Sequence, residues 1–411
     1  MSGPVSFSGN LLATLRHRDF RNLWLGSFAS YAGQWIQQAT IAWLAYDMTG
    51  SKSMLGLIMG MRAIPMFLCA PFAGVAADRY DRRKLLMGSQ LISALTALVF
   101  GIVVATGAAQ IWHLFVFVLV SGVAGVLDRP ARLTIIFDLV PRGEAMQAVA
   151  INMIAFSIAR ITGPAIAGYL IAWVGAEGNL FLQAFVYAAA AVTVFMTTLP
   201  PREIKPSGMS ALHDLMQGVR FAFTDPTARV LLMAGMTPFI LLVPIFGGLL
   251  PLYAKDVFNA GPEVLGMLLT SVGVGGVGGS WLASKCVLLK RQGVVQACAV
   301  FVMSAGFLAL AVAPTVALAC AALVLSGSAE MVHFTSNQAT LQMKVPESMR
   351  GRITSLMQLY PGFVSIGIVI EGIIADVIGI QWVTVGIAIA ASTAMALLLA
   401  RGGLAEVQVT K

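Results

Sequence analysis

The sequence predicts an all-α integral membrane protein with twelve transmembrane helices in two halves of six. Hydrophobic residues make up 58% of the 411 residues and charged residues only 11%, which is less than half of the charged fraction usual in soluble domains. The mean hydropathy is +0.86. Apolar runs long enough to cross a bilayer recur along the whole chain, and mostly short polar links separate them.

Each predicted helix is a run of about 20 or more mainly apolar residues, the length that crosses the hydrocarbon core of a bilayer. In chain order, these runs cover residues 22–46, 53–77, 84–107, 112–136, 146–173, 179–199, 228–253, 263–285, 293–313, 316–340, 352–377 and 380–401. Their spread from one end of the chain to the other predicts that nearly all of it is membrane domain.

The charges of the links predict the orientation. Lysine and arginine gather in every second link and are few in the others, chiefly Lys52 and Lys255. Because cations in short loops stay in the cytoplasm, we expect a multi-pass membrane protein with both termini inside. These loops also account for the formal charge of +8, so no nucleic-acid partner is expected.

The longest polar stretch covers residues 200–229 and separates the two halves. Apolar residues recur in it at helical spacing, which predicts an amphipathic helix on the cytoplasmic surface: Leu212, Leu215, Met216, Val219 and Phe223. We therefore divide the chain into residues 1–199, 200–227 and 228–411. The outer two parts are weakly similar, and two six-helix repeats are typical of transporters with a substrate path between them.

Charged groups inside membrane helices are costly and usually face a cavity or a partner. Arg62 lies near mid-depth of the second predicted helix, where it would bind an anion or pair with an acid. Glu330 begins a polar stripe with His333 and Asn337 in the tenth, and Glu371 lies among apolar residues in the eleventh. A carboxyl group screened from water can exchange protons, so Glu330 and Glu371 are the candidate proton sites, with a structural role as the alternative.

Amide and phenol side chains predict a substrate cavity. One side of the first predicted helix carries Tyr31, Gln34, Gln37 and Gln38. So much polar surface does not suit lipid, and a mainly apolar cavity with a few amides suits amphiphilic molecules. Arg62, His333 and Asn337 belong to the same set, together with three further candidates: Asn152, Gln358 and Tyr360.

A charged cluster predicts a gate at the cytoplasmic side. Asp128, Arg129 and Arg132 lie toward the cytoplasmic end of the fourth predicted helix, where they could pair with Asp78 when that side closes. Pairs that form in one state and break in another suit a rocking transporter. The alternative is that these cations only anchor the helix end.

The loop after the second predicted helix carries a resemblance to a known family. The pattern Gly74-x-x-x-Asp78-Arg79-x-Asp81-Arg82-Arg83 resembles the signature loop of the major facilitator superfamily. Asp81 stands where many members have glycine, and this variant resembles a branch of bacterial exporters that includes the enterobactin exporter and macrolide efflux proteins. Further segments resemble the same branch: residues 19–24, 44–51, 130–132, 345–347 and 350–352. The resemblance implies the major facilitator fold, a location in the bacterial inner membrane and a gating role for this loop.

The fifth predicted helix holds a second pattern. Arg160, Gly163, Pro164 and Gly168 are similar to the motif associated with exporters of this superfamily. The glycines allow close helix approach, and the proline bends the helix, so the segment would seal the path between the halves. An ordinary packing face is the alternative, and Arg160 would then tie the helix to a neighbour.

We expect a monomeric exporter of a small amphiphilic molecule, driven by proton antiport. The sequence has no phosphate-binding loop for ATP and no metal-ligand pattern, so no cofactor besides the proton gradient is expected, and no catalytic residue is assigned. The alternatives are siderophore export, proton-coupled uptake of an anion at Arg62, and lipid flipping or a receptor without transport.

Overall fold

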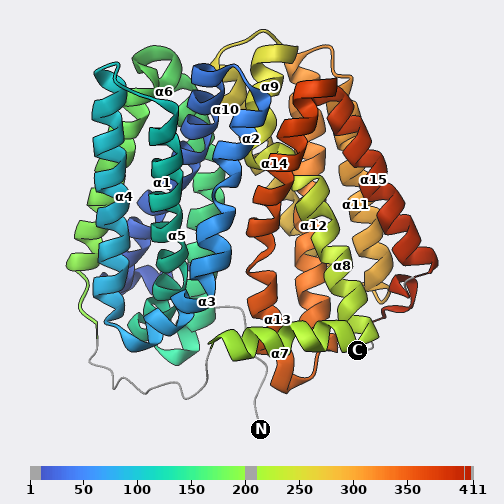
Figure 1. Cartoon of the computed structure of the whole chain (residues 1–411). Coiled ribbons are helices and arrows are strands. Elements are labelled where there is room, and N and C mark those ends of the chain that lie inside the picture. Colours follow the sequence, from blue (N-terminus) through green and yellow to red (C-terminus); the bar gives the residue numbers. More distant parts are fainter. Residues whose placement is uncertain (1–10, 200–210, 402, 409–411) are drawn as a thin grey trace.

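The computed structural model describes residues 11–199, 211–401 and 403–408, and this part of the chain is helical throughout, without a strand (Figure 1). Long helices stand side by side in two groups. The N-terminal group contains α1 (Arg18–Thr49), α2 (Lys52–Gly60), α3 (Ala63–Arg79), α4 (Arg82–Ala105), α5 (Ile111–Leu139) and α6 (Ala145–Phe195). The C-terminal group contains α8 (Pro226–Leu241), α9 (Leu250–Leu252), α10 (Pro262–Cys286), α11 (Gln292–Ala311), α12 (Val316–Lys344), α13 (Glu347–Met357), α14 (Tyr360–Ile378) and α15 (Ile380–Ala400).

Within the described residues, ten helical stretches are long and apolar enough to cross a membrane. One of them, α6, has 51 residues and is two helices joined at Gly175, whose φ of 84° is not helical. The 32-residue α1 is not among the ten, although a helix of that length is about 48 Å long, which exceeds the thickness of a bilayer.

The seventh predicted helix changes from α8 into a π-helical turn, and two others are each interrupted by a break. The second predicted helix consists of α2 and α3, and the turn between them contains Met61 and Arg62. The eleventh consists of α13 and α14, with Gln358 and Leu359 at the break. A proline follows each break within three residues, Pro65 and Pro361, and proline removes a backbone donor that a continuous helix would use. Both breaks lie in the wall of the cavity described below.

The helix α7 (Ala211–Thr224) crosses one end of the bundle, beside α13 (Figure 1). We call this the α7 end, and the opposite one the far end. Met216 and Phe223 of α7 are 64% and 72% exposed, so the helix has the apolar outer face expected of one that lies on a membrane surface. The start of the predicted linker, residues 200–210, and the side chains of Leu212 and Leu215 lie outside the described set.

Two close helix contacts join the groups. In the first, α6 packs on α10, and a Cβ added to Gly168 would lie 2.9 Å from the Cα of Gly266. In the second, α2 packs on α14, and a Cβ added to Gly56 would lie 3.2 Å from the Cα of Gly372. Small residues permit such approach of helix backbones, and the cavity lies between these two contacts.

Candidate functional site

A cavity of about 920 Å³ lies between the two groups. Methionine, phenylalanine and aliphatic side chains form much of its wall, and a limited set of polar side chains interrupts them. The predicted residues that line it are Tyr31, Gln34, Gln37, Gln38, Arg62, Asp128, Arg129, Arg160, Glu330 and Gln358. Residues 300 positions apart thus meet in one space, as a substrate path between two halves requires.

The amides of α1 occupy one wall. Gln37 is buried, and its Oε1 accepts a hydrogen bond from the Tyr187 hydroxyl at 3.1 Å. The Tyr31 hydroxyl accepts one from Asn152 Nδ2 at 2.9 Å. Asn152 itself does not line the cavity, so it positions Tyr31 from behind.

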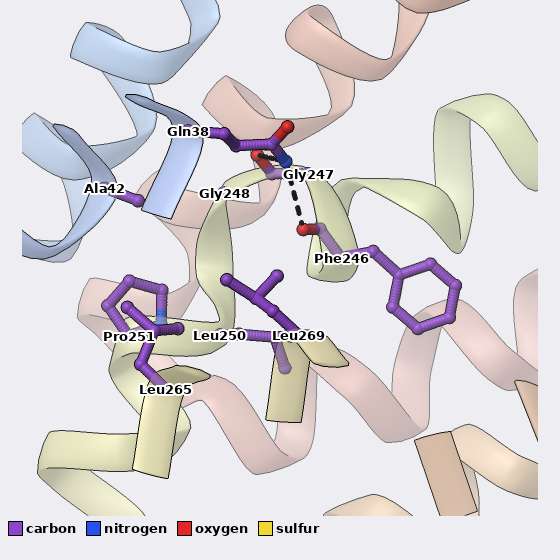
Figure 2. Close-up of a pocket in the computed structure, with 9 residues that line it drawn as sticks. All are labelled: Gln38, Ala42, Phe246, Gly247, Gly248, Leu250, Pro251, Leu265 and Leu269. Atoms are coloured by element: carbon purple, nitrogen blue, oxygen red, sulfur yellow. Dashed lines mark hydrogen bonds between the residues drawn. The ribbon is translucent and has the colours of Figure 1, made fainter. Parts of the chain in front are cut away.

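Gln38 joins the groups where a small recess adjoins α1, shown in Figure 2. Its Nε2 donates to the carbonyl oxygens of Gly247 at 3.0 Å and Phe246 at 3.5 Å. Both carbonyls belong to η3 (Ile245–Leu249), a π-helical turn. A π-turn interrupts the regular pattern of helical hydrogen bonds and is frequent at functional sites, and here it leaves these carbonyls accessible to a side chain from the other group.

A mid-depth ion pair also crosses between the groups. Arg160 Nη2 of α6 lies 2.6 Å from Glu330 Oε2 of α12, and each side chain is 14% exposed. The Arg160 guanidinium also lies 5.6 Å from the ring centre of Trp35. The sequence pointed to Arg160 as a gating residue and Glu330 as a proton site separately, and the structure brings them into one contact.

A second buried pair stays within the N-terminal group. Arg132 Nη2 lies 2.8 Å from Asp128 Oδ1, and its Nη1 donates to the Ser27 hydroxyl at 2.7 Å. Gln90 donates to Asp128 as well. Pairing of this cluster with Asp78 stays a prediction, because the side chains of Gly74, Asp78 and Arg79 lie outside the described residues.

The rest of the signature loop fastens three helices at the α7 end. Asp81 is the N-cap of α4, where its side chain accepts from the backbone N–H groups of Arg83 at 2.9 Å and Lys84 at 3.3 Å. Arg82 pairs with Asp138 near the end of α5 at 2.7 Å. Arg83 donates to the last carbonyl of α6, that of Phe195. Aspartate rather than glycine at position 81 is therefore explained by helix capping.

Besides Asn152, four of the predicted cavity and proton-site residues lie away from the cavity wall. Glu371 is 3% exposed, and neither of its carboxyl oxygens has a hydrogen-bond partner in the described part of the chain. His333 and Asn337 are buried beside α11, where Asn337 donates to Gln296 at 3.0 Å. Tyr360 is 2% exposed. Glu330 is thus separated from His333 and Asn337, although all three were predicted to form one polar stripe. Glu330 lies on the side of α12 that faces the cavity, whereas the other two lie on the adjoining side, which faces α11.

The exporter-like segment of α6 touches both groups. A Cβ added to Gly163 would lie 2.7 Å from Trp35 Cβ of α1, and one added to Gly168 would lie 2.6 Å from the Pro262 carbonyl oxygen at the start of α10. Gly163 and Gly168 thus both lie at close contacts of α6 with other helices, with Pro164 between them.

A set of contacts at the far end was not predicted from the sequence. Asp256 accepts from the Tyr46 hydroxyl at 2.5 Å and pairs with Lys52 at 3.4 Å. Lys255 pairs with Asp47, and Asp376 accepts from the backbone N–H groups of Lys52 and Ser53 at the start of α2. Each contact joins the N-terminal to the C-terminal group. The signal was present, since the two cations of these cation-poor links, Lys52 and Lys255, both take part. We call these residues the far-end network.

The comparisons with known proteins agree with this geometry. The sequence model of the family described as transmembrane secretion effector, MFS_3, matches residues 9–410. The chain is 26% identical to the staphyloferrin A transporter of Staphylococcus aureus, over 86% of this chain and 89% of the relative. It is 23% identical to macrolide efflux protein A of Streptococcus pyogenes, over 88% and 90%.

The fold also has a counterpart among solved structures. A bacterial homologue of the human lysosomal transporter Spinster, in an inward-facing and unoccupied conformation, superposes with a TM-score of 0.76 at 13% identity and full coverage of both chains. A multi-pass helical bundle, a cavity between two groups of helices and a family match over almost the whole length lead to one assignment. The chain belongs to the transmembrane secretion effector family, and it is a membrane transporter of the major facilitator superfamily rather than an enzyme.

Proposed function

We propose that this transporter exports a small amphiphilic organic molecule across the bacterial inner membrane by alternating access and proton antiport. The observation that carries the proposal is the cavity of about 920 Å³ between the two groups, within the range of sites that enclose drug-sized ligands. Its walls are mainly apolar and carry the amides Gln34, Gln37, Gln38 and Gln358. Such a surface suits molecules that are largely apolar and carry a few polar groups.

The proposed topology has twelve spans, with both termini and α7 in the cytoplasm. It is supported by the division of α6 at Gly175 and by the length of α1. The two groups of helices then correspond to residues 1–199 and 228–411, joined by the linker 200–227. In this topology the far-end network closes the external side, and Asp128 and Arg129 line the part of the cavity nearer the cytoplasm. The conformation is therefore inward-facing.

Proton coupling is proposed to act on the pair of Arg160 and Glu330. Protonation of Glu330 removes the charge that holds Arg160, and so weakens a contact between α6 and α12. Because this pair joins the two groups and lines the cavity, breaking it would couple proton binding to movement of the groups. Glu371 is the second candidate, since a buried carboxyl without a partner is far less costly when it is neutral.

The signature loop is proposed to latch the cytoplasmic side in the opposite state. Asp78 would then pair with the cluster of Asp128, Arg129 and Arg132, while the far-end network separates. Each set of contacts would hold one of two states, as alternating access requires.

Everted membrane vesicles test this function. Vesicles containing the transporter should accumulate a fluorescent amphiphile, such as dansyl-leucine, when the lumen is acidic, and nigericin should abolish the accumulation by collapsing the pH gradient. The Glu330→Gln variant should bind dye but lose gradient-driven uptake. Uptake that continues unchanged after nigericin addition would remove antiport from the proposal while leaving the transport intact.

Siderophore export is a second candidate, favoured by the similarity to the staphyloferrin A transporter. The same vesicles would distinguish it, because a siderophore exporter should accumulate purified siderophore and not the dansyl dye.

A further inference from the structure

Arg62 occupies an unusual place in the cavity wall. It lies in the turn that separates α2 from α3, and its side chain is half-buried and lines the cavity. The break in the helix occurs at the cation itself, one turn before Pro65. The backbone is therefore interrupted at the position from which a charged side chain meets the cavity.

The two acidic side chains of the cavity wall are both paired. Glu330 is paired with Arg160, and Asp128 is paired with Arg132. Two cations of the wall remain, Arg62 and Arg129. Among the residues that the structure describes, neither has an ion pair, a hydrogen bond or a ring contact with its guanidinium. The wall thus carries an excess of positive charge.

A guanidinium in such a setting needs a counter-charge. A cation at membrane depth is unfavourable without a partner, and mainly apolar walls strengthen its attraction for an anion. The neighbouring polar groups of this wall cannot supply a charge, because Gln37 and Tyr187 are neutral and already bonded to each other. The missing charge has to come from a ligand or from a mobile anion.

We propose that the transported molecule is an organic anion whose carboxylate, or an equivalent acidic group, binds Arg62. This inference rests on the proposed function and names the substrate class. A guanidinium can donate two parallel hydrogen bonds to one carboxylate. The amides Gln34 and Gln358 and the apolar wall are left for the remainder of the molecule.

Arg129, at the entrance of the cavity, supports the same class of substrate, an organic anion. It is exposed and lines the cavity from the part of α5 nearer the α7 end. A cation at the mouth raises the local concentration of anions and their association rate. Arg129 therefore guides anions toward the deeper Arg62.

A matched pair of dyes tests the charge requirement. Dansyl-leucine carries a carboxylate, and dansyl-leucinamide is its neutral analogue. Each is titrated against the purified full chain in phosphatidylcholine nanodiscs, and binding is followed by dansyl emission. The wild type should bind the anion roughly ten- to a hundredfold more tightly, the range for one hydrogen-bonded charge interaction.

Three variants locate the effect. Arg62→Gln should bring the ratio of the two dissociation constants close to one. The dissociation constant of dansyl-leucinamide should stay unchanged, which also shows that the variant is folded. Arg62→Lys should retain part of the preference. Lys290→Gln, which removes an exposed cation that is not in the cavity wall, should behave as the wild type.

The outcomes separate this inference from the proposed function. Equal binding of the two dyes by the wild type, or a preference that survives in Arg62→Gln, overturns the anion site alone. Binding of neither dye overturns the amphiphile cavity and the anion site together. In discs containing phosphatidylglycerol, displacement of dansyl-leucine would assign the site to an anionic lipid headgroup, and an unchanged dissociation constant would assign it to soluble anions.

Discussion

At the scale of single residues, charge near the membrane is used in two ways. Some charged side chains terminate helices, as Asp81 and Arg83 do at the ends of α4 and α6. Others form contacts that join the two groups, as Arg160 and Glu330 do. Capping groups stay fixed while a transporter moves, whereas cross-group pairs can break, so the two uses predict different consequences of substitution.

Asp81→Ala should lower stability without changing dye binding. It removes a cap that satisfies two backbone N–H groups, and loss of such a cap costs about 1 kcal/mol. Thermal unfolding of the detergent-solubilised protein measures this cost. Asp81→Asn keeps an accepting oxygen and should unfold close to the wild type. Equal losses in both variants would contradict the capping role.

Arg160 and Glu330 should show energetic coupling. Removing either partner leaves the other without its counter-charge, so Arg160→Gln and Glu330→Gln should each destabilise the protein. The double variant should lose less than the sum of the two, with a coupling of about 1–3 kcal/mol. A double-mutant cycle of unfolding midpoints checks this, and strict additivity would exclude a direct interaction.

At the scale of helices, the positions of the apolar helices could be predicted from the sequence, because hydropathy is a local property. The ranges of the apolar runs and the helix of the linker follow from composition and periodicity alone. The breaks at Arg62 and Gln358 were not predicted, although Pro65 and Pro361 were visible, because proline also occurs in bent but continuous helices. The pair of Arg160 and Glu330 was not predicted as a pair, since residues so distant in sequence meet only through helix packing.

The contact between α6 and α10 should be sensitive to one added methyl group. A Cβ at position 168 would lie 2.6 Å from a backbone oxygen of α10, so Gly168→Ala should destabilise this conformation by about 1–3 kcal/mol. Gly88→Ala in α4 is the matched control, because nothing lies within 4 Å of a Cβ there. A change in unfolding midpoint that is equal in both variants would contradict tight packing at Gly168.

At the scale of the whole molecule, the two groups are in contact at the far end and enclose a cavity that extends toward the α7 end. The basic links of the sequence directed attention to the α7 end, where cations are numerous. The cross-group contacts at the far end involve fewer charged residues. Each of them still joins the groups, because Asp47, Asp256 and Asp376 each contact a lysine or a helix start of the other group. Charge counts along a sequence indicate orientation, but they do not reveal which contacts hold a conformation.

Asp256→Asn should therefore shift the molecule toward a state that is open at the far end. The substitution removes the carboxylate charge that accepts from the Tyr46 hydroxyl and pairs with Lys52. If the closed state loses about 1 kcal/mol relative to the open state, the ratio of the two populations changes about fivefold. Spin labels on the far-end segments of α1 and α10 should report a larger population of long distances. Glu263→Gln removes a carboxylate from the same end, where Glu263 has no cross-group partner among the described residues, and its distances should match the wild type. If Asp256→Asn leaves the distances unchanged, the far-end network does not hold the closed state, and the contact of Gln38 with the η3 carbonyls becomes the element to test next.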